Sequence, residues 1–146
     1  MNPDDQELTR ELRRDEGVEY KPYKDTMGIW TVGVGHNMEA HPLPSDWTFP
    51  LTDEQVDRLL AQDVLDVFND LDRVFPWWRN MSMVRQRVIA NMCFNLGAPR
   101  LAGFKNTLAA MEQGRYTTAA AGMMASLWAK QVGKRAERLA EMMVNG

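Results

Sequence analysis

The sequence has a single cysteine and only two histidines. One thiol cannot form a disulfide within the chain, so folding does not require an oxidising compartment. Cys93 lies in the apolar run VIANMCFNLG, with no histidine or basic residue close to it in sequence, which favours a buried side chain over a reactive nucleophile. With His36 and His41 as the only imidazoles and no cysteine cluster, we expect neither a metal site nor a cofactor.

The sequence also lacks a long hydrophobic run. No stretch is apolar enough to span a membrane, and the N-terminal segment MNPDDQELTRELRRDEG has no apolar core of the kind found in signal peptides. We therefore expect the protein to be made and kept in a cytoplasm. The composition, 45% hydrophobic and 25% charged, is that of an ordinary globular protein, and 146 residues favour one domain divided into lobes.

The net charge of -3 conceals an uneven distribution along the chain. Residues 1–78 sum to -10, whereas residues 79–146 sum to +7. A basic half favours a polyanionic partner, although attraction between the two halves would account for the same distribution. Because no nucleic-acid-binding motif accompanies the basic half, we do not expect the partner to be a nucleic acid.

Hydrophobic spacing and cap residues predict an α+β protein that is mainly helical. A cap at Asn2 with Pro3 in the first turn predicts a helix over 3–16, which Gly17 ends. Residues 18–36 read as a hairpin or small sheet, and 37–51 as a loop. Further helices are predicted over 52–74, 82–96, 104–113, 117–129 and 134–144. The first of these begins with a capping box, Thr52 with Gln55, and Gly97 stops the second.

The segment IWTVGVGH alternates in a way typical of a strand. A period of two places one set of side chains on one face (Trp30, Val32, Val34 and His36) and a second set on the other (Ile29, Thr31, Gly33 and Gly35). Glycine weakens a strand, so two glycines on one face suggest close approach by a ligand or another backbone. Relief of packing against a helix is an equally good explanation.

Two carboxylates, Glu16 and Asp25, have contrasting local environments. Glu16 lies at the C-terminal end of the first predicted helix, where a negative charge is disfavoured, which makes it a candidate proton donor. Asp25 lies in a polar turn beside Lys24, where an ionised carboxylate is favoured. Such a pair suits glycoside hydrolysis, in which one acid protonates the leaving oxygen and the other assists water. Solvated surface roles for both acids explain the same pattern.

Asp63 lies on the apolar stripe of the helix predicted over 52–74 and therefore needs a polar partner. His36, at the end of the predicted strand, is the candidate, and a structural ion pair is the preferred interpretation. The alternative is a His and Asp pair that serves a nucleophile or a metal. Near the C-terminus, Arg135 and Arg138 share a helical face that could be solvated or could hold an acid.

The string LRRDEGVEYKPYKDTMGIWTVGVGH resembles the signature of the phage-type lysozymes, glycoside hydrolase family 24. It joins an acid and glycine at a helix end to Tyr-Lys-Asp-Thr-x-Gly and Thr-x-Gly-x-Gly-His. The resemblance continues through LTDEQVDRLLAQDV, VIANMCFNLG, LAGFKNTL and SLWAKQVGKRAERL. It implies one lysozyme domain over 1–146, with a sheet-bearing lobe over about 17–51, an inter-lobe helix over 52–74, and a helical lobe over 75–146 plus the helix 3–16.

The resemblance also implies an activity and a set of residues. Family members hydrolyse the β-1,4 bond between N-acetylmuramic acid and N-acetylglucosamine in bacterial peptidoglycan, with inversion. Carried over, Glu16 is the general acid, Asp25 supports the attacking water, and Thr31 helps to position that water. The other positions implied are the sugar groove (Asn37, Phe94 and Thr107) and two ion pairs, His36 with Asp63 and Glu16 with Arg135.

The implied biological role is an endolysin for host lysis. The resemblance places it in the host cytoplasm until a holin opens the inner membrane, after which it reaches the cell wall; we expect a monomer with no direct contact to the holin. Two departures from the family pattern stand out: the segment between His36 and Asp63 is short, and Gly122 replaces a polar groove contact. Alternatives are a lytic transglycosylase, which needs a lone acid, and a non-catalytic wall-binding or tail-assembly protein.

Overall fold

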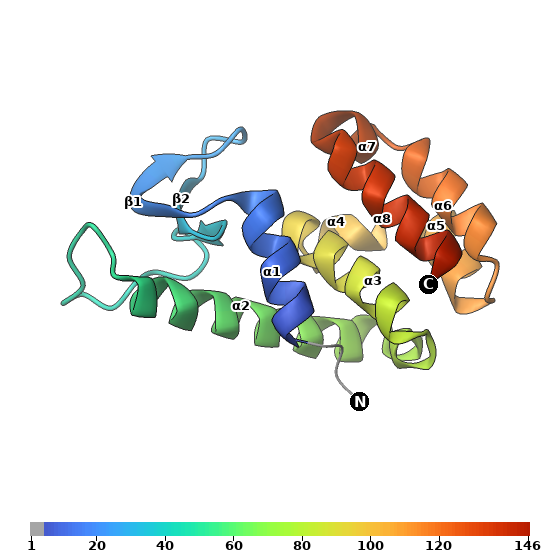
Figure 1. Cartoon of the computed structure of the whole chain (residues 1–146), viewed down its shortest axis with the longest axis horizontal. Helices are drawn as coiled ribbons and strands as arrows, with labels where there is room; N and C mark the ends of the chain where they lie inside the picture. Colours follow the sequence, from blue (N-terminus) through green and yellow to red (C-terminus); the bar gives the residue numbers. More distant parts are fainter. Residues whose placement is uncertain (1–4) are drawn as a thin grey trace. The chain divides into compact units, whose positions relative to one another are not determined.

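The computed structural model describes residues 5–146, so the helix cap predicted at Asn2 and Pro3 lies outside them. The fold is mainly helical with one small antiparallel sheet, which confirms the predicted α+β class (Figure 1). The elements in chain order are α1 (Asp5–Glu16), β1 (Glu19–Lys24), β2 (Trp30–Gly33), β3 (His36–Asn37), α2 (Asp53–Val74), the 3-10 helix η1 (Pro76–Asn80), α3 (Met83–Leu96), α4 (Ala98–Ala102), α5 (Lys105–Glu112), α6 (Tyr116–Met124), α7 (Leu127–Val132) and α8 (Lys134–Asn145).

The chain forms two compact units, one over residues 6–66 and the other over 67–146, with the boundary inside α2. The first unit holds α1, the whole sheet and the beginning of α2. The second holds the remainder of α2 and the helices η1 and α3 to α8. That these units are the lobes of one lysozyme domain stays a prediction.

In the first unit, α1 presents a narrow apolar stripe to the core. Leu8 and Leu12 are fully buried, as their spacing of four residues requires of one helical face. Gly17 adopts a φ of +74°, and its N–H donates to the Arg13 carbonyl at 2.9 Å, so the helix ends in a left-handed glycine. The Arg13 side chain also pairs with Asp57 on α2, which ties these two helices together.

The sheet has the order β1-β2-β3, with both pairs antiparallel. Thr31 on β2 is paired with Tyr23 on β1 and with Asn37 on β3. Directly opposed residues project from the same face of a sheet, so these three side chains form one row across it, the Thr31 row. Lys24 and Trp30 are the next pair and occupy the opposite face, where the Lys24 Nζ lies 5.3 Å from the Trp30 ring centroid.

The predicted alternation of buried and exposed side chains from Ile29 to His36 is wrong at the beginning and at the end of this segment. Val32, Val34 and His36 are buried, but Trp30 is 46% exposed. The strand ends at Gly33, and Gly33 and Gly35 have φ values of +68° and +63°, so the chain turns and the period of two is lost. Only glycine adopts this conformation without strain, which gives both glycines a backbone role that the pattern did not reveal.

Helix α2 begins with the predicted capping box. The Gln55 N–H donates to Thr52 Oγ1 at 3.1 Å, and the Thr52 N–H donates to Gln55 Oε1 at 2.9 Å. Within the first unit the helix buries Val56, Leu60 and Val64, which recur every four residues. The prediction of a long helix over 52–74 is therefore confirmed.

The second unit is built around α3. Its start is capped by Ser82, whose Oγ accepts from the Arg85 N–H at 3.2 Å, and Gly97 ends it with a φ of +79°. Helix α8 packs against α3, α6 and α7. Cys93 on α3 is 2% exposed, and burial raises the pKa of its thiol to about 12, so this side chain is the buried hydrophobe that the sequence predicts.

The single helix predicted over 117–129 is wrong, because the chain forms two helices there, α6 and α7. Ser126 interrupts the helix: its hydroxyl donates to the Met123 carbonyl at 2.6 Å and accepts from the Ala129 N–H at 3.2 Å. A serine that bonds to neighbouring backbone groups ends one helix and caps the next. The short helices η1 and α4, which have Pro76 and Pro99 in their first turns, were not predicted from the sequence.

Between residues 5 and 146, the structure contains no helix that combines the length and the hydrophobicity needed to cross a lipid bilayer.

Candidate active site

Glu16 is the last residue of α1 and lies against the turn between β2 and β3. A Cβ placed on Gly35 would lie 2.9 Å from Glu16 Oε1, so a side chain at Gly35 would displace the carboxylate. At Gly33, in contrast, the nearest atom to such a Cβ is a Val56 side-chain carbon of α2 at 3.8 Å. A side chain at Gly33 would make only ordinary van der Waals contact with α2, so the φ of +68° and not close packing accounts for glycine there, whereas Gly35 is also approached closely by the Glu16 carboxylate.

Asp25 lies just beyond the end of β1 and is held by the turn that follows. Its Oδ1 accepts from the backbone N–H groups of Met27, at 2.8 Å, and Ile29, at 2.9 Å. The Asp25 N–H donates to the Ile29 carbonyl at 3.0 Å, which extends the β1-β2 pairing by one step. In the described part of the chain Oδ2 accepts no hydrogen bond, so one carboxylate oxygen anchors the side chain and the other is available for a ligand or water.

Thr31 is held by Ile29, which also binds Asp25. It is 4% exposed, and its hydroxyl donates to the Ile29 carbonyl at 2.9 Å. With its proton used in this bond, the Thr31 oxygen presents lone pairs and is suited to accept a hydrogen bond. Ile29 therefore orients Asp25 and Thr31 together through its N–H and its carbonyl.

Asn37 follows on β3, in the Thr31 row. Its side-chain oxygen accepts from the N–H groups of Glu39, at 3.0 Å, and Ala40, at 2.9 Å, and so stabilises the turn after β3. The unit over residues 6–66 thus brings together Glu16, Asp25, Thr31 and Asn37. Their roles in catalysis and sugar binding stay predictions.

Tyr23 is a member of this group that the sequence analysis did not single out. Its side chain shares the face of Thr31, and it precedes Asp25 by two residues on the same edge of the sheet. Burial raises the pKa of the Tyr23 phenol, and the negative charges of Glu16, Glu19 and Asp25 raise it further. The signal that could have revealed it is the spacing of two from Asp25, which places alternate residues of a strand on one face.

His36 and Asp63 lie together in the same unit. Asp63 Oδ2 is 2.7 Å from His36 Nδ1, and the His41 carbonyl is 2.8 Å from His36 Nε2. Burial by itself lowers the pKa of His36, but the hydrogen bond and charge of Asp63, aided by the His41 carbonyl, raise the pKa above its ordinary value. Both ring nitrogens face acceptors, so the doubly protonated imidazolium is the form that satisfies both.

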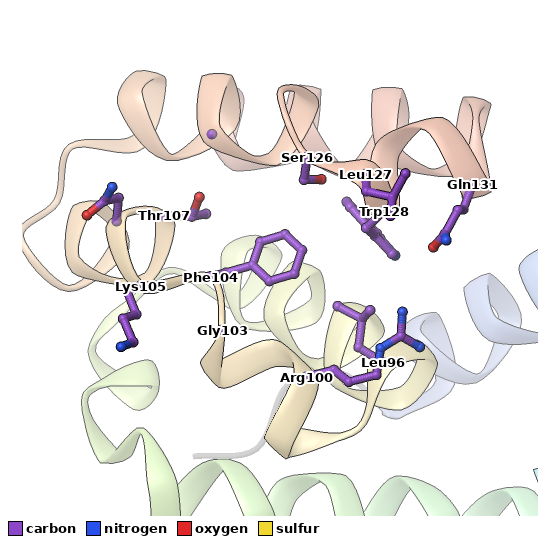
Figure 2. Close-up of a pocket in the computed structure, with 12 residues that line it drawn as sticks. Leu96, Arg100, Gly103, Phe104, Lys105, Thr107, Ser126, Leu127, Trp128 and Gln131 are labelled. Atoms are coloured by element: carbon purple, nitrogen blue, oxygen red, sulfur yellow. The ribbon is translucent and has the colours of Figure 1, made fainter.

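Thr107 belongs to the second unit and lines a pocket of about 710 Å³ (Figure 2). The Phe104 and Trp128 rings form an edge-to-face pair in its wall, with centroids 6.2 Å apart, and Arg100 and Lys105 add positive charge. Phe94, half-buried on α3, is not among the residues that line this pocket. The assignment of Phe94 and Thr107 to a sugar groove stays a prediction.

Gly122 on α6 lies directly against Thr107 on α5. A Cβ at Gly122 would lie 2.3 Å from Thr107 Oγ1, so the threonine hydroxyl occupies the space that a side chain at 122 would need. In this chain the polar group at this point of the pocket is therefore supplied by Thr107.

This contact predicts that Gly122→Ala changes the free energy of unfolding in opposite directions in the wild-type protein and in a Thr107→Ala variant. Gly122→Ala should lower the free energy of unfolding by about 1 kcal/mol, because the new methyl group forces Thr107 from its rotamer. In a Thr107→Ala background the same substitution should raise it by up to about 1 kcal/mol, since alanine favours a helix over glycine. Urea denaturation of the four proteins measures both effects, and an effect of equal sign in both backgrounds would contradict the proposed clash.

Arg135 is 6% exposed in the second unit, and its Nε donates to Asn91 Oδ1 at 2.9 Å. A buried guanidinium held in this way has a defined orientation. Its pairing with Glu16 stays a prediction. Among residues 5–146, no three side chains of His, Cys, Asp or Glu are grouped so that they could hold a metal ion.

Comparison with known proteins gives similar relatives of three kinds. The chain is 33% identical over 132 residues to the endolysin of Salmonella phage P22, covering 87% of this chain and 82% of that protein. It is 25% identical over 156 residues to the probable T4-type lysozyme 2 of Dictyostelium discoideum, covering 92% of each. It is also 28% identical over 179 residues to the pre-baseplate central spike protein Gp5 of Enterobacteria phage T4.

The match to the spike protein takes in all of this chain but only 31% of the spike protein, so this chain spans about a third of that relative. The family model of phage lysozyme matches residues 13–142, which include α1 from Arg13 onward, the whole sheet and most of α8. The chain therefore belongs to the phage lysozyme family.

Proposed function

We propose that this protein is a glycosidase that hydrolyses the β-1,4 bond between N-acetylmuramic acid and N-acetylglucosamine in bacterial peptidoglycan. Membership of the phage lysozyme family supports the reaction class. The observation that carries the proposal is the joint anchoring of Asp25 and Thr31 on Ile29, in the unit that also contains Glu16. Such an arrangement suits a reaction in which one carboxyl group protonates the leaving oxygen and a second group activates water.

Glu16 is the proton donor in this proposal. It transfers its proton to the glycosidic oxygen as the bond to the anomeric carbon breaks, so the leaving sugar departs as a neutral alcohol. Gly35 leaves room for the carboxyl group beside the turn, and any larger residue there would push the acid out of position. Glu16 is regenerated in its protonated form after the product leaves and a proton is taken from solvent.

Asp25 and Thr31 act on the water. One water hydrogen is donated to Asp25 Oδ2 and the other to the Thr31 hydroxyl oxygen, because Asp25 Oδ1 and the Thr31 proton are already used by Ile29. A water held by both hydrogens turns its oxygen lone pair toward the anomeric carbon. It attacks opposite the leaving oxygen, Asp25 accepts the proton, and the configuration at the anomeric carbon inverts. Asp25 then releases this proton to solvent, which balances the proton that Glu16 takes up.

The proposed biological role is lysis of a bacterial host at the end of phage infection. The relative from phage P22 is named an endolysin, and the same role for this chain would require that it reach the cell wall after another phage protein, a holin, has opened the inner membrane. We propose that it acts as a monomer. The +7 charge of residues 79–146, including Arg100 and Lys105 at the pocket, favours attraction to an anionic wall.

Digestion of purified peptidoglycan tests this proposal. The expected result is the appearance of reducing ends, with mass spectrometry of the muropeptides showing the addition of one water at each cleaved bond. Proton NMR of freshly released ends should show the α-anomer, as inversion of a β-bond requires. Anhydro products would identify a lytic transglycosylase instead, and the absence of any released fragment would favour a wall-binding protein without activity.

A further inference from the structure

We propose that Tyr23 is a further substrate-contacting residue of this site. Its phenol hydroxyl donates a hydrogen bond to an uncharged oxygen of the sugar that is held between Glu16 and Asp25. This inference rests on the proposed glycosidase function and adds one specific contact to it. Three observations support it: the position of Tyr23 in the sheet, a hydroxyl group without a hydrogen bond among the described residues, and the charges around it.

The sheet register places Tyr23 beside the residues proposed for the water. Tyr23 is directly opposite Thr31 in the β1-β2 pair, and such partners have Cβ atoms about 5 Å apart. Asp25 follows two residues later, and its N–H continues the same pairing to Ile29, so its side chain leaves the sheet on the side of Tyr23. Lys24 and Trp30, which contact each other, occupy the opposite face.

The Tyr23 hydroxyl makes no hydrogen bond within residues 5–146, although the residue is half-buried. Tyr20, on the same strand, shows the contrast: its hydroxyl donates to Asp53 Oδ1 at 2.6 Å and so fastens β1 to α2. A half-buried phenol usually finds a partner for its O–H group. For Tyr23 that partner must come from outside the described residues, and a bound sugar or water in the site can supply it.

The charges near Tyr23 indicate which kind of group it can bind. Burial and the carboxylates of Glu16, Glu19 and Asp25 all act to keep the phenol protonated, so it serves as a donor. The negative charges of Glu19 and Asp25 repel an anionic group, which excludes the stem-peptide carboxylates of peptidoglycan as partners. The remaining acceptors are the neutral oxygens of the sugar, namely its hydroxyl groups and its acetamide carbonyl.

The test compares Tyr23→Phe with Tyr20→Phe, a matched loss of one hydroxyl on the same strand. On soluble glycan fragments of peptidoglycan, Tyr23→Phe should lower kcat/KM by about five- to tenfold, the usual cost of one lost hydrogen bond. A contact already made in the bound substrate should raise KM and leave kcat close to that of wild type. The unfolding midpoint of Tyr23→Phe should stay at the wild-type value.

Tyr20→Phe should behave in the opposite way, with a lower unfolding midpoint and an unchanged kcat/KM. An unchanged kcat/KM for Tyr23→Phe, beside an active wild-type enzyme, would overturn the inference and leave the proposed function intact. A wild-type protein that releases no fragments would instead refute the proposed function itself. A Tyr23→Phe enzyme with unchanged KM and a shifted pH profile would also overturn the inference, because the phenol would then act through Glu16 and not on the sugar.

Discussion

Replacing Glu16 with glutamine should lower kcat on purified peptidoglycan by about a thousandfold or more, because an amide cannot donate a proton to the leaving oxygen and a general acid contributes about 10²- to 10⁴-fold. Without that proton the sugar would have to leave as an alkoxide. Asp25 and Thr31 would still hold the water, so a small residual rate should survive. Release of reducing ends under saturating substrate measures the effect.

The fold should tolerate this substitution. Glutamine has nearly the shape of glutamate and therefore fits in the space that Gly35 leaves beside the turn. We expect the unfolding midpoint to change by no more than about 4 °C, which corresponds to about 1 kcal/mol for a chain of this size. Near-equal midpoints would show that the lost activity is chemical and not a consequence of unfolding.

Glu141→Gln is the matched control. Glu141 is exposed on α8 and lies outside the groups described for the site, so its loss of charge should leave both activity and stability unchanged. Wild-type activity in Glu16→Gln would remove Glu16 from the mechanism. An equal loss of activity in both variants would show that the assay responds to net charge, for instance through attraction to the wall.

The second large effect concerns stability. Asp63→Asn should lower the free energy of unfolding by about 3 kcal/mol at pH 5.5, since breaking one side of a buried ion pair typically costs about 3–5 kcal/mol. His36 is 4% exposed, so without Asp63 its positive charge would be buried with only the His41 carbonyl and the more distant charge of Asp66 to compensate it. Urea denaturation followed by circular dichroism measures the loss.

The destabilisation caused by Asp63→Asn should become smaller as the pH rises. The pKa of His36 is raised in the folded protein above the value of about 6.5 expected for the unfolded chain. The stabilisation from the charged pair is therefore fully present below about pH 6.5 and is lost as the pH rises through the folded pKa. Once the pH lies above the folded pKa, for which pH 9 is the test condition, the imidazole is neutral and Asp63→Asn should cost only about 1 kcal/mol, the worth of an ordinary hydrogen bond.

Asp70→Asn serves as the control on the same helix. Asp70 forms an exposed pair with Arg73, and such surface pairs contribute about 0–1 kcal/mol. Its removal should have a small effect at both pH values. If Asp63→Asn were equally destabilising at pH 5.5 and pH 9, the stability of this region would come from packing and neutral hydrogen bonds, and the charged pair would not be its source.

The elements that were predicted well are those specified by close neighbours in sequence. The start of α2 depends on Thr52 and Gln55, three residues apart, and the end of α3 depends on one glycine, Gly97. The predictions that failed were those in which a side chain competes for backbone hydrogen bonds or in which strand pairing decides the structure. An alanine-rich run favoured one helix over 117–129, but hydrogen bonds from the Ser126 side chain to nearby backbone groups divided it into α6 and α7.

In the candidate site, too, local features were predicted from the sequence and long-range ones were not. The sequence by itself was enough to determine an α+β class and the family resemblance, and to single out Glu16 and Asp25 as candidate acids, because motifs and periodicity act over a few residues. Only the tertiary structure decided that Tyr23 shares a row with Thr31 and that Gly35 makes room for Glu16. The physical reason is that strand register and the backbone turn at Gly33 and Gly35 determine which distant side chains meet, and neither leaves a local pattern in the sequence.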